Sequence, residues 1–174
     1  LGISPEKAAK SVSRAESIAG RMERVPNSFG INIIIDYAHT PDALLKLLET
    51  ARSFKTEGQR VVLLFGCGGD REKQKRKIMG GIAVSKADFV IITSDNPRSE
   101  EPLEIIDDIL LGVGENKNFT VIPDRRRAIE YAIATARKGD IILLAGKGQE
   151  TYLDIKGVKT HFDEREVVNS YFNR

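Results

Sequence analysis

The chain has 174 residues, of which 41% are hydrophobic and 30% charged, so it can bury a full core and lacks the composition of a disordered protein. Its net charge of +2 is too small to indicate binding to nucleic acid or to an anionic membrane. The single cysteine, Cys67, excludes a disulfide framework within the chain, cannot form a metal site alone, and is expected to be a small buried hydrophobe. Because we find neither a membrane-length apolar run nor a leader, we expect a cytoplasmic protein without nucleic-acid or membrane partners.

Helices and strands alternate in the first half of the sequence. In chain order the patterns predict a helix from Ser4 that stops at Gly20, a strand over 31–36, a helix opened by Thr40 and Pro41, a strand over 60–66, a helix over 74–86 and a strand over 88–93. Such alternation is typical of a mainly parallel sheet with helices on its faces.

The second half continues the alternation and ends with a hairpin. It is predicted to contain a helix from Pro102, a strand over 119–122, a helix capped by Asp124 that runs to about Arg137, a strand over 140–145, a hairpin of 151–155 with 158–161, and a last helix started by a capping box of Asp163 and Glu166. The fold class is therefore α/β. We predict a single Rossmann-like, doubly wound, mainly parallel sheet with a C-terminal hairpin.

Four of the predicted strands run directly into polar loops that contain glycine or proline. These loops span 36–41, 66–71, 93–98 and 146–150. In an open α/β sheet, ligands bind outside the carboxyl ends of the strands, where such loops gather. The sequence therefore predicts a site for a polar ligand at this edge of the sheet.

The first two loops offer acid, histidine and arginine. Asp36 at a strand tip suits the hydroxyls of a ribose or a cation, whereas His39 is equally consistent with a structural role and with a ligand contact. The glycines of 66–71 do not complete the dinucleotide fingerprint, but they permit close backbone approach. Arg71 could form a forked contact with a carboxylate or a phosphate.

The other two loops offer groups that match an amino acid. Asn96 and Arg98 flank a stiffening proline and suit a planar carboxylate, although a merely structural turn is the alternative. Gly146 provides bare backbone, and Glu150 is the kind of group that binds an ammonium.

Two runs of basic residues are interpreted as solvent-facing. Lys73, Lys75, Arg76 and Lys77 are expected on a solvated helix face, and residues 125–127 are expected to be exposed, with phosphate binding as the alternative. We assign no role to His161. The sequence contains no Walker-type phosphate loop, so either ATP is not used or another domain holds its phosphates.

Together these motifs resemble the C-terminal domain of a Mur ligase. The resemblance is carried, in the family's order and spacing, by Gly20–Glu23, Asp36–Leu44, Gly66–Arg71, Thr93–Arg98 and Ala145–Tyr152. We therefore assign residues 20–174 to this domain and residues 1–19 to a linker helix that leaves a central domain outside the chain.

This resemblance implies an ATP-dependent acid–amino-acid ligase of peptidoglycan synthesis. In such enzymes ATP phosphorylates the carboxylate of UDP-MurNAc-L-Ala-D-Glu, and the incoming amine attacks the acyl phosphate. It further implies that ATP and Mg²⁺ are held mainly by the central domain. The present domain would be inactive alone, would contain no metal site or catalytic residue of its own, and would be monomeric.

The resemblance also implies roles for individual residues. Positions that match nucleotide contacts are Arg21, Asp36 and His39, and positions that match the amino-acid site are Arg71, Asp95, Asn96, Pro97, Arg98, Gly146 and Glu150. The Asn-Pro-Arg form is associated with meso-diaminopimelate. Gln149 departs from the family's usual histidine and removes a titratable group. A lysine-adding version of the same ligase and a non-catalytic Rossmann-like binding module remain alternatives. Folylpolyglutamate and cyanophycin synthetases fit residues 95–98 less well.

Overall fold

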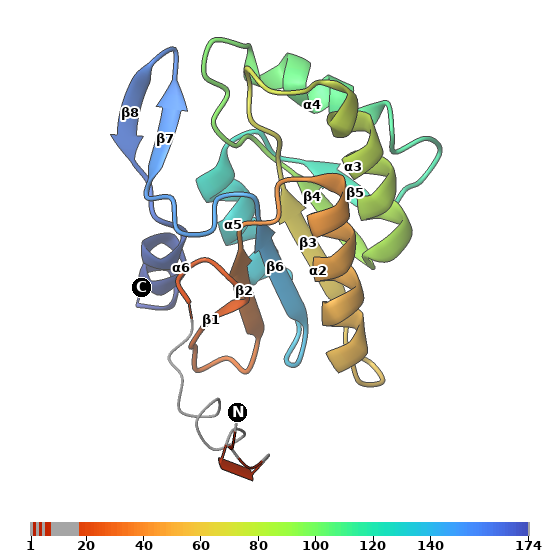
Figure 1. Cartoon of the computed structure of the whole chain (residues 1–174), viewed down its shortest axis with the longest axis vertical. Coiled ribbons are helices and arrows are strands. Elements are labelled where there is room, and N and C mark those ends of the chain that lie inside the picture. The colour runs from red at the N-terminus through yellow and green to blue at the C-terminus, as the bar shows by residue number, and fades with distance from the viewer. Residues whose placement is uncertain (1, 3, 5, 8–17, 174) are drawn as a thin grey trace.

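A computed structural model describes residues 2, 4, 6–7 and 18–173 (Figure 1). The linker helix predicted for residues 1–19 lies largely outside the described residues. Gly20 itself lies in a turn with a φ of +69°, a conformation that glycine adopts without strain. Within the described part of the chain, no helix combines the length and the apolar character needed to cross a bilayer.

The centre of the fold is a six-stranded sheet with the order β1-β2-β6-β3-β4-β5. Its strands are β1 (Glu23–Val25), β2 (Asn32–Asp36), β3 (Val61–Phe65), β4 (Phe89–Ile92), β5 (Phe119–Val121) and β6 (Ile141–Ala145). β2, β6, β3, β4 and β5 pair in parallel, and only β1 runs antiparallel to its neighbour β2. The predicted mainly parallel Rossmann-like sheet is confirmed, with the short edge strand β1 as an unpredicted addition.

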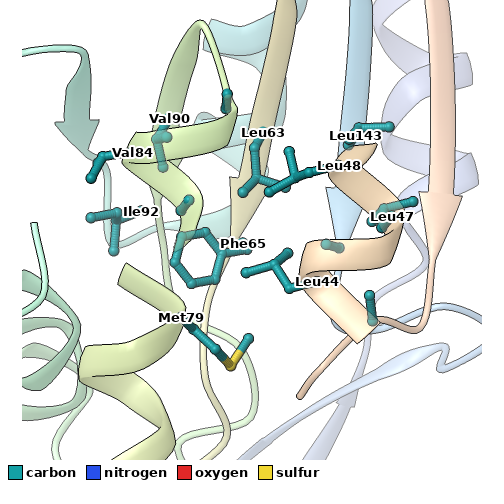
Figure 2. Packing of buried hydrophobic residues seen from close by; sticks show 14 of the residues in the cluster. Leu44, Leu47, Leu48, Leu63, Phe65, Met79, Val84, Val90, Ile92 and Leu143 are labelled. Carbon is teal, nitrogen blue, oxygen red and sulfur yellow. The ribbon is translucent and has the colours of Figure 1, made fainter. Parts of the chain in front are cut away.

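Helices cover both faces of this sheet (Figure 1). One face carries α2 (Pro41–Phe54), α3 (Gln74–Lys86) and α4 (Pro102–Leu110), and the other carries α5 (Arg125–Ala134) and α6 (Glu164–Phe172). Figure 2 shows the first of the two cores, which contains Leu44 and Leu48 of α2, Leu63 and Phe65 of β3, and Met79 of α3. Because both faces are covered, β3 and β6 are buried along their whole length.

The starts of α2 and α5 follow the capping chemistry of the sequence. Thr40 Oγ1 accepts a hydrogen bond from Ala43 N (3.3 Å), and an Asp124 carboxylate oxygen accepts one from Arg127 N (3.0 Å). The predicted end of α5 near residue 137 is wrong, since the helix ends at Ala134. The Asp140 carboxylate accepts a hydrogen bond from the backbone N–H of residue 137 (2.9 Å) and holds the following residues in a turn.

The predicted hairpin is present as β7 (Tyr152–Ile155) and β8 (Val158–His161), which form a separate two-stranded sheet. It is attached to the 93–98 loop through backbone bonds. Arg98 N donates to Asp154 O (3.0 Å), and Lys156 N donates to Arg98 O (2.7 Å). The hairpin therefore fixes the backbone of a predicted site residue.

Candidate functional site

The four polar loops meet at the carboxyl edge of the sheet, as the sequence predicts. Because β6 lies between β2 and β3, the 146–150 loop lies between the loops that follow these two strands, and the 93–98 loop follows the next strand, β4. A pocket of about 500 Å³ opens here. It is lined by Tyr37, His39, Thr40, Gly68, Arg71, Glu72, Lys75, Asp95, Asn96, Arg98, Gly146, Glu150 and Tyr152.

Seven of the ten predicted site residues line this pocket, namely His39, Arg71, Asp95, Asn96, Arg98, Gly146 and Glu150. The other three lie beside it. The Arg21 guanidinium lies 4.9 Å from the centroid of the Tyr37 ring, so it contacts the pocket wall from outside. Pro97 lines a second hollow of about 350 Å³.

Asp36, the third of these residues, has both carboxylate oxygens bonded to backbone N–H groups. Oδ2 accepts from Met22 N (2.8 Å) and Oδ1 accepts from Ala38 N (2.9 Å). Met22 has a φ of +45°, so the carboxylate stabilises an unusual turn. Asp36 thereby joins the strand tip to the segment that precedes β1.

Arg98 forms the basic side of the pocket. Its φ of +52° lies in the left-handed region, and the backbone bonds to the hairpin hold it there. Its Nη1 donates to Gly69 O (2.7 Å), which uses one of the five N–H donors of a guanidinium. A Cβ atom at position 68 would lie 2.8 Å from Nη1, so glycine makes room for the arginine. Arg71 is a more exposed cation that lines the same pocket.

Glu150 forms the acidic side. Its Oε2 accepts a hydrogen bond from Asn96 Nδ2 (2.8 Å), and its Oε1 lies 3.5 Å from the Tyr37 hydroxyl. Burial raises the pKa of Tyr37, and the negative charge of Glu150 acts in the same direction. Gly146 has a φ of +114°, and a Cβ atom there would lie 2.7 Å from Asp95 Oδ2. Only glycine allows this close approach.

Three buried cations near the loops were not recognised from the sequence. The prediction that Arg76 is solvated is wrong, because it is fully buried and pairs with Glu100 (2.8 Å) and Asp108 (3.0 Å). The prediction that Arg125 is exposed is also wrong, because it is 2% exposed and pairs with Glu164. Each partner lies at least 24 residues away in the chain, so no local spacing could have revealed it.

The third buried cation is Lys147, which the sequence placed in the site loop without a role. Its side chain is fully buried beneath the pocket.

Cys67 matches its prediction. It is 3% exposed, and burial raises the pKa of its thiol to about 12, so it is not a reactive thiolate. Among the residues that the structure describes, no group of three His, Cys, Asp or Glu side chains is placed to hold a metal ion.

The pocket is thus lined both by guanidinium groups and by a fixed carboxylate. A guanidinium binds a carboxylate through paired N–H donors, and a carboxylate binds an ammonium through its oxygens. The arrangement suits a small ligand that carries both charges, such as an amino acid.

The chain is similar to several known proteins. Residues 20–148 match the family model described as Mur ligase, glutamate ligase domain. The chain is 47% identical, over its whole length, to the UDP-N-acetylmuramoyl-L-alanyl-D-glutamate–2,6-diaminopimelate ligase of Clostridioides difficile, of which it covers 36%. It is 50% identical, over 97% of its length, to the second such ligase of Clostridium acetobutylicum, of which it covers 35%.

A solved structure of a UDP-N-acetylmuramoyl-L-alanyl-D-glutamate–2,6-diaminopimelate ligase superposes with a TM-score of 0.83 at 37% identity. The superposition covers 99% of this chain and 35% of that one. The chain therefore spans about a third of the length of the relatives that it matches. From the family match and these identities, the chain belongs to the Mur ligase family and corresponds to its glutamate ligase domain.

Proposed function

We propose that this chain is the amino-acid-binding and ATP-closing C-terminal domain of a ligase that adds meso-diaminopimelate to UDP-MurNAc-L-Ala-D-Glu in peptidoglycan synthesis. The observation that carries the proposal is the pair of opposite charges, Arg98 and Glu150, that line one pocket. The names of the relatives at 47% and 50% identity support the same activity. The domain alone is proposed to be inactive, monomeric and cytoplasmic.

In this proposal, Arg98 makes the site select diaminopimelate over lysine. The two amino acids differ by one carboxylate at the far end of the side chain. A hydrogen bond to a charged group contributes about 1.5–3 kcal/mol, and a site built for such a group rejects an analogue that lacks it. Lysine would leave the desolvated guanidinium without its partner. In this proposal Glu150 holds an ammonium group of the substrate, and Arg71 adds positive charge nearby.

Arg21, Asp36 and His39 are proposed to lie at the nucleotide side. Arg21 and His39 both pack on Tyr37, whose ring centroid is 4.5 Å from that of the histidine. When bound, ATP supplies the phosphoryl group that activates the acceptor carboxylate. With no Walker-type loop in this sequence, we propose that a central domain outside the chain holds the phosphates and Mg²⁺.

The test is the Arg98→Ala variant of the full-length ligase. We expect its KM for diaminopimelate to rise about 10- to 150-fold, which corresponds to one lost charged hydrogen bond, while its KM for ATP stays unchanged. The exposed Arg127→Ala is the matched control and is expected to leave both constants unchanged. An equal rise of the KM for diaminopimelate and of the KM for ATP would contradict the assignment of Arg98 to the diaminopimelate site.

Wild-type turnover separates the alternatives. A ligase that uses lysine in preference to diaminopimelate would identify the lysine-adding version. An intact protein that releases no phosphate with either amino acid would favour a binding module.

A further inference from the structure

We infer that Lys147 is a positioning residue that fixes the Asn96 side-chain amide and, through it, the orientation of the Glu150 carboxylate. This inference rests on the proposed function, because it assigns Glu150 to capture of the incoming amino acid. It also changes the interpretation of Asn96, whose amide then holds a neighbouring protein group in place.

The Lys147 ammonium lies among three side-chain acceptors. Its Nζ is 3.0 Å from Asn96 Oδ1, 3.5 Å from Asp95 Oδ1 and 3.7 Å from Glu150 Oε2. All three acceptors belong to residues that line the pocket, whereas Lys147 is fully buried and does not line it. Lys147 therefore has no direct contact with the pocket and can act on a ligand only through these neighbours.

The contacts of Asn96 permit one orientation of its amide. Oδ1 faces two donors, Lys147 Nζ and Asp154 N, which lie 3.0 Å away in each case. An ammonium has no acceptor, so an amide turned by 180° would place its NH₂ group against a cation. The amide must therefore present Nδ2 to Glu150 Oε2, at 2.8 Å. The Lys147 ammonium thus determines that Nδ2 of Asn96, and not Oδ1, faces the Glu150 carboxylate.

The same geometry limits the position of the Glu150 carboxylate. Its Oε2 is held by Asn96 Nδ2 and lies near Lys147 Nζ, while Oε1 lies near the Tyr37 hydroxyl. Tyr37 is part of the pocket wall. A carboxylate held at both oxygens is ready to receive an ammonium without first losing side-chain freedom.

The charge of Lys147 depends on the groups that face it from four segments. The carboxylates of Asp95, Glu150 and Glu164 favour the ammonium, and the Arg125 guanidinium opposes it. The Tyr152 ring lies 5.6 Å from Nζ. Burial is the largest influence and lowers the pKa of Lys147 below its ordinary value. The ammonium is therefore lost at a lower pH than in an exposed lysine.

The test compares Lys147→Met with Lys77→Met, an exposed lysine of α3, in the full-length ligase. We expect Lys147→Met to raise the KM for diaminopimelate about ten-fold or more, as for loss of a charged hydrogen bond, with the KM for ATP within about two-fold of wild type. Lys77→Met should leave both constants unchanged. Equal rises of both constants, or no rise for diaminopimelate in a folded Lys147→Met protein, would overturn the inference.

The pH dependence supplies a readout that a purely structural lysine would not produce. The ratio of the diaminopimelate KM of Lys147→Met to that of the wild type should fall towards one as the pH rises, because the wild-type ammonium is then lost. Titration of the substrate cancels in this ratio. A ratio that stays constant up to the alkaline limit of the assay would contradict the inference.

A second variant keeps the test decisive if Lys147→Met does not fold. Asn96→Asp has nearly the same shape but places an oxygen opposite Glu150, so we expect a raised diaminopimelate KM and an unchanged ATP KM. Where Lys147→Met does fold, the KM effects of the two substitutions should be less than additive in the double variant, since both act on one contact. A wild-type diaminopimelate KM in Asn96→Asp would overturn the inference. Failure of the wild type to use diaminopimelate would instead refute the proposed function.

Discussion

At the scale of single residues, Arg76 shows what a buried charge requires. Its guanidinium is fully buried and is paired with the Glu100 and Asp108 carboxylates. Removing one partner of a buried ion pair costs about 3–5 kcal/mol, because the other charge is left uncompensated. We expect Arg76→Ala to lower the free energy of unfolding by about 3 kcal/mol in urea titrations, since Glu100 retains some solvent contact.

The neighbouring exposed Lys77→Ala is the control and should change the free energy of unfolding by less than about 0.5 kcal/mol. If the two alanine variants were equally stable, Arg76 would contribute little to the fold, despite its burial.

Glu100 gives the protein a specific sensitivity to acid. The hydrogen bonds from Arg76 lower the pKa of Glu100 to about 2 in the folded protein. A carboxyl with a lowered folded pKa stabilises the protein above its unfolded pKa, and this contribution is lost as the pH falls towards the folded value. We therefore expect stability to decrease between about pH 4.5 and pH 2.

Glu100→Gln should reduce this slope, which the lowered pKa values of Glu23, Asp88 and Asp140 also produce, and the exposed Glu104→Gln on α4 should leave it unchanged. The measurement is the urea midpoint at several acid pH values. If the urea midpoints of Glu100→Gln and of the wild type fell in parallel as the pH decreased, other carboxyl groups would dominate the loss of stability in acid.

At the scale of elements, α3 and α4 approach each other closely through glycine. A Cβ atom on Gly80 would lie 2.2 Å from Ile109 O, a distance at which the backbone must shift. The next residue, Gly81, has its nearest contact at 3.3 Å. We expect Gly80→Ala to destabilise the protein by about 1–3 kcal/mol, the usual cost of overpacking.

Gly81→Ala is a closely matched control, because the same helix gains about 1 kcal/mol of intrinsic propensity from either alanine. Its stability should equal or exceed that of the wild type, because the contact at 3.3 Å offsets only part of the gain in propensity. Equal unfolding free energies for the two variants would mean that α3 and α4 can separate without cost.

The elements that depend on local chemistry were predictable from the sequence. The start of α2 at Thr40 and the start of α5 at Asp124 follow from side chains that cap their own helix. The three-residue strand β1 was not predicted, because it contains a single buried residue and exists through pairing with β2. The end of α5 was placed too late for a similar reason, since Asp140 fixes the turn from outside the helix.

In the candidate site, too, the features set by local sequence were predictable and those set by contacts distant in the sequence were not. The loop positions follow from the alternation of strands and helices, so seven of the predicted residues meet in one pocket. The buried charges Arg76, Arg125 and Lys147 could not be inferred, because their burial depends on partners brought together by the sheet order. The loop pattern therefore identifies most of the groups that reach the site but not Tyr37 or Tyr152, which also line it, and the structure identifies the contacts that hold these groups.

At the scale of the whole molecule, the first described turn, the C-terminal helix and the 146–150 loop form one connected unit. Glu23 accepts hydrogen bonds from Gly20 N (2.6 Å) and from Arg165 Nε of α6 (2.7 Å). Arg165 Nη2 in turn donates to Gly148 O (3.4 Å). The segment that leads into the domain is therefore attached to the loop that carries Glu150.

Gly20→Ala tests this connection. An added Cβ would lie 2.1 Å from Gln149 N and 2.3 Å from the Gly148 carbonyl carbon, and the φ of +69° disfavours any other residue.

Gly58→Ala is the control, because its φ of +82° carries similar strain and its Cβ would meet nothing within 4 Å. Gly58→Ala should lower the free energy of unfolding by about 1–2 kcal/mol, from strain alone. The free energy of unfolding of Gly20→Ala should be lower by a further ~1–3 kcal/mol because of the collision. In the proposed full-length ligase, Gly20→Ala should also raise the KM for diaminopimelate. If the two variants matched in stability and in KM, the start of the domain and the Glu150 loop would be independent.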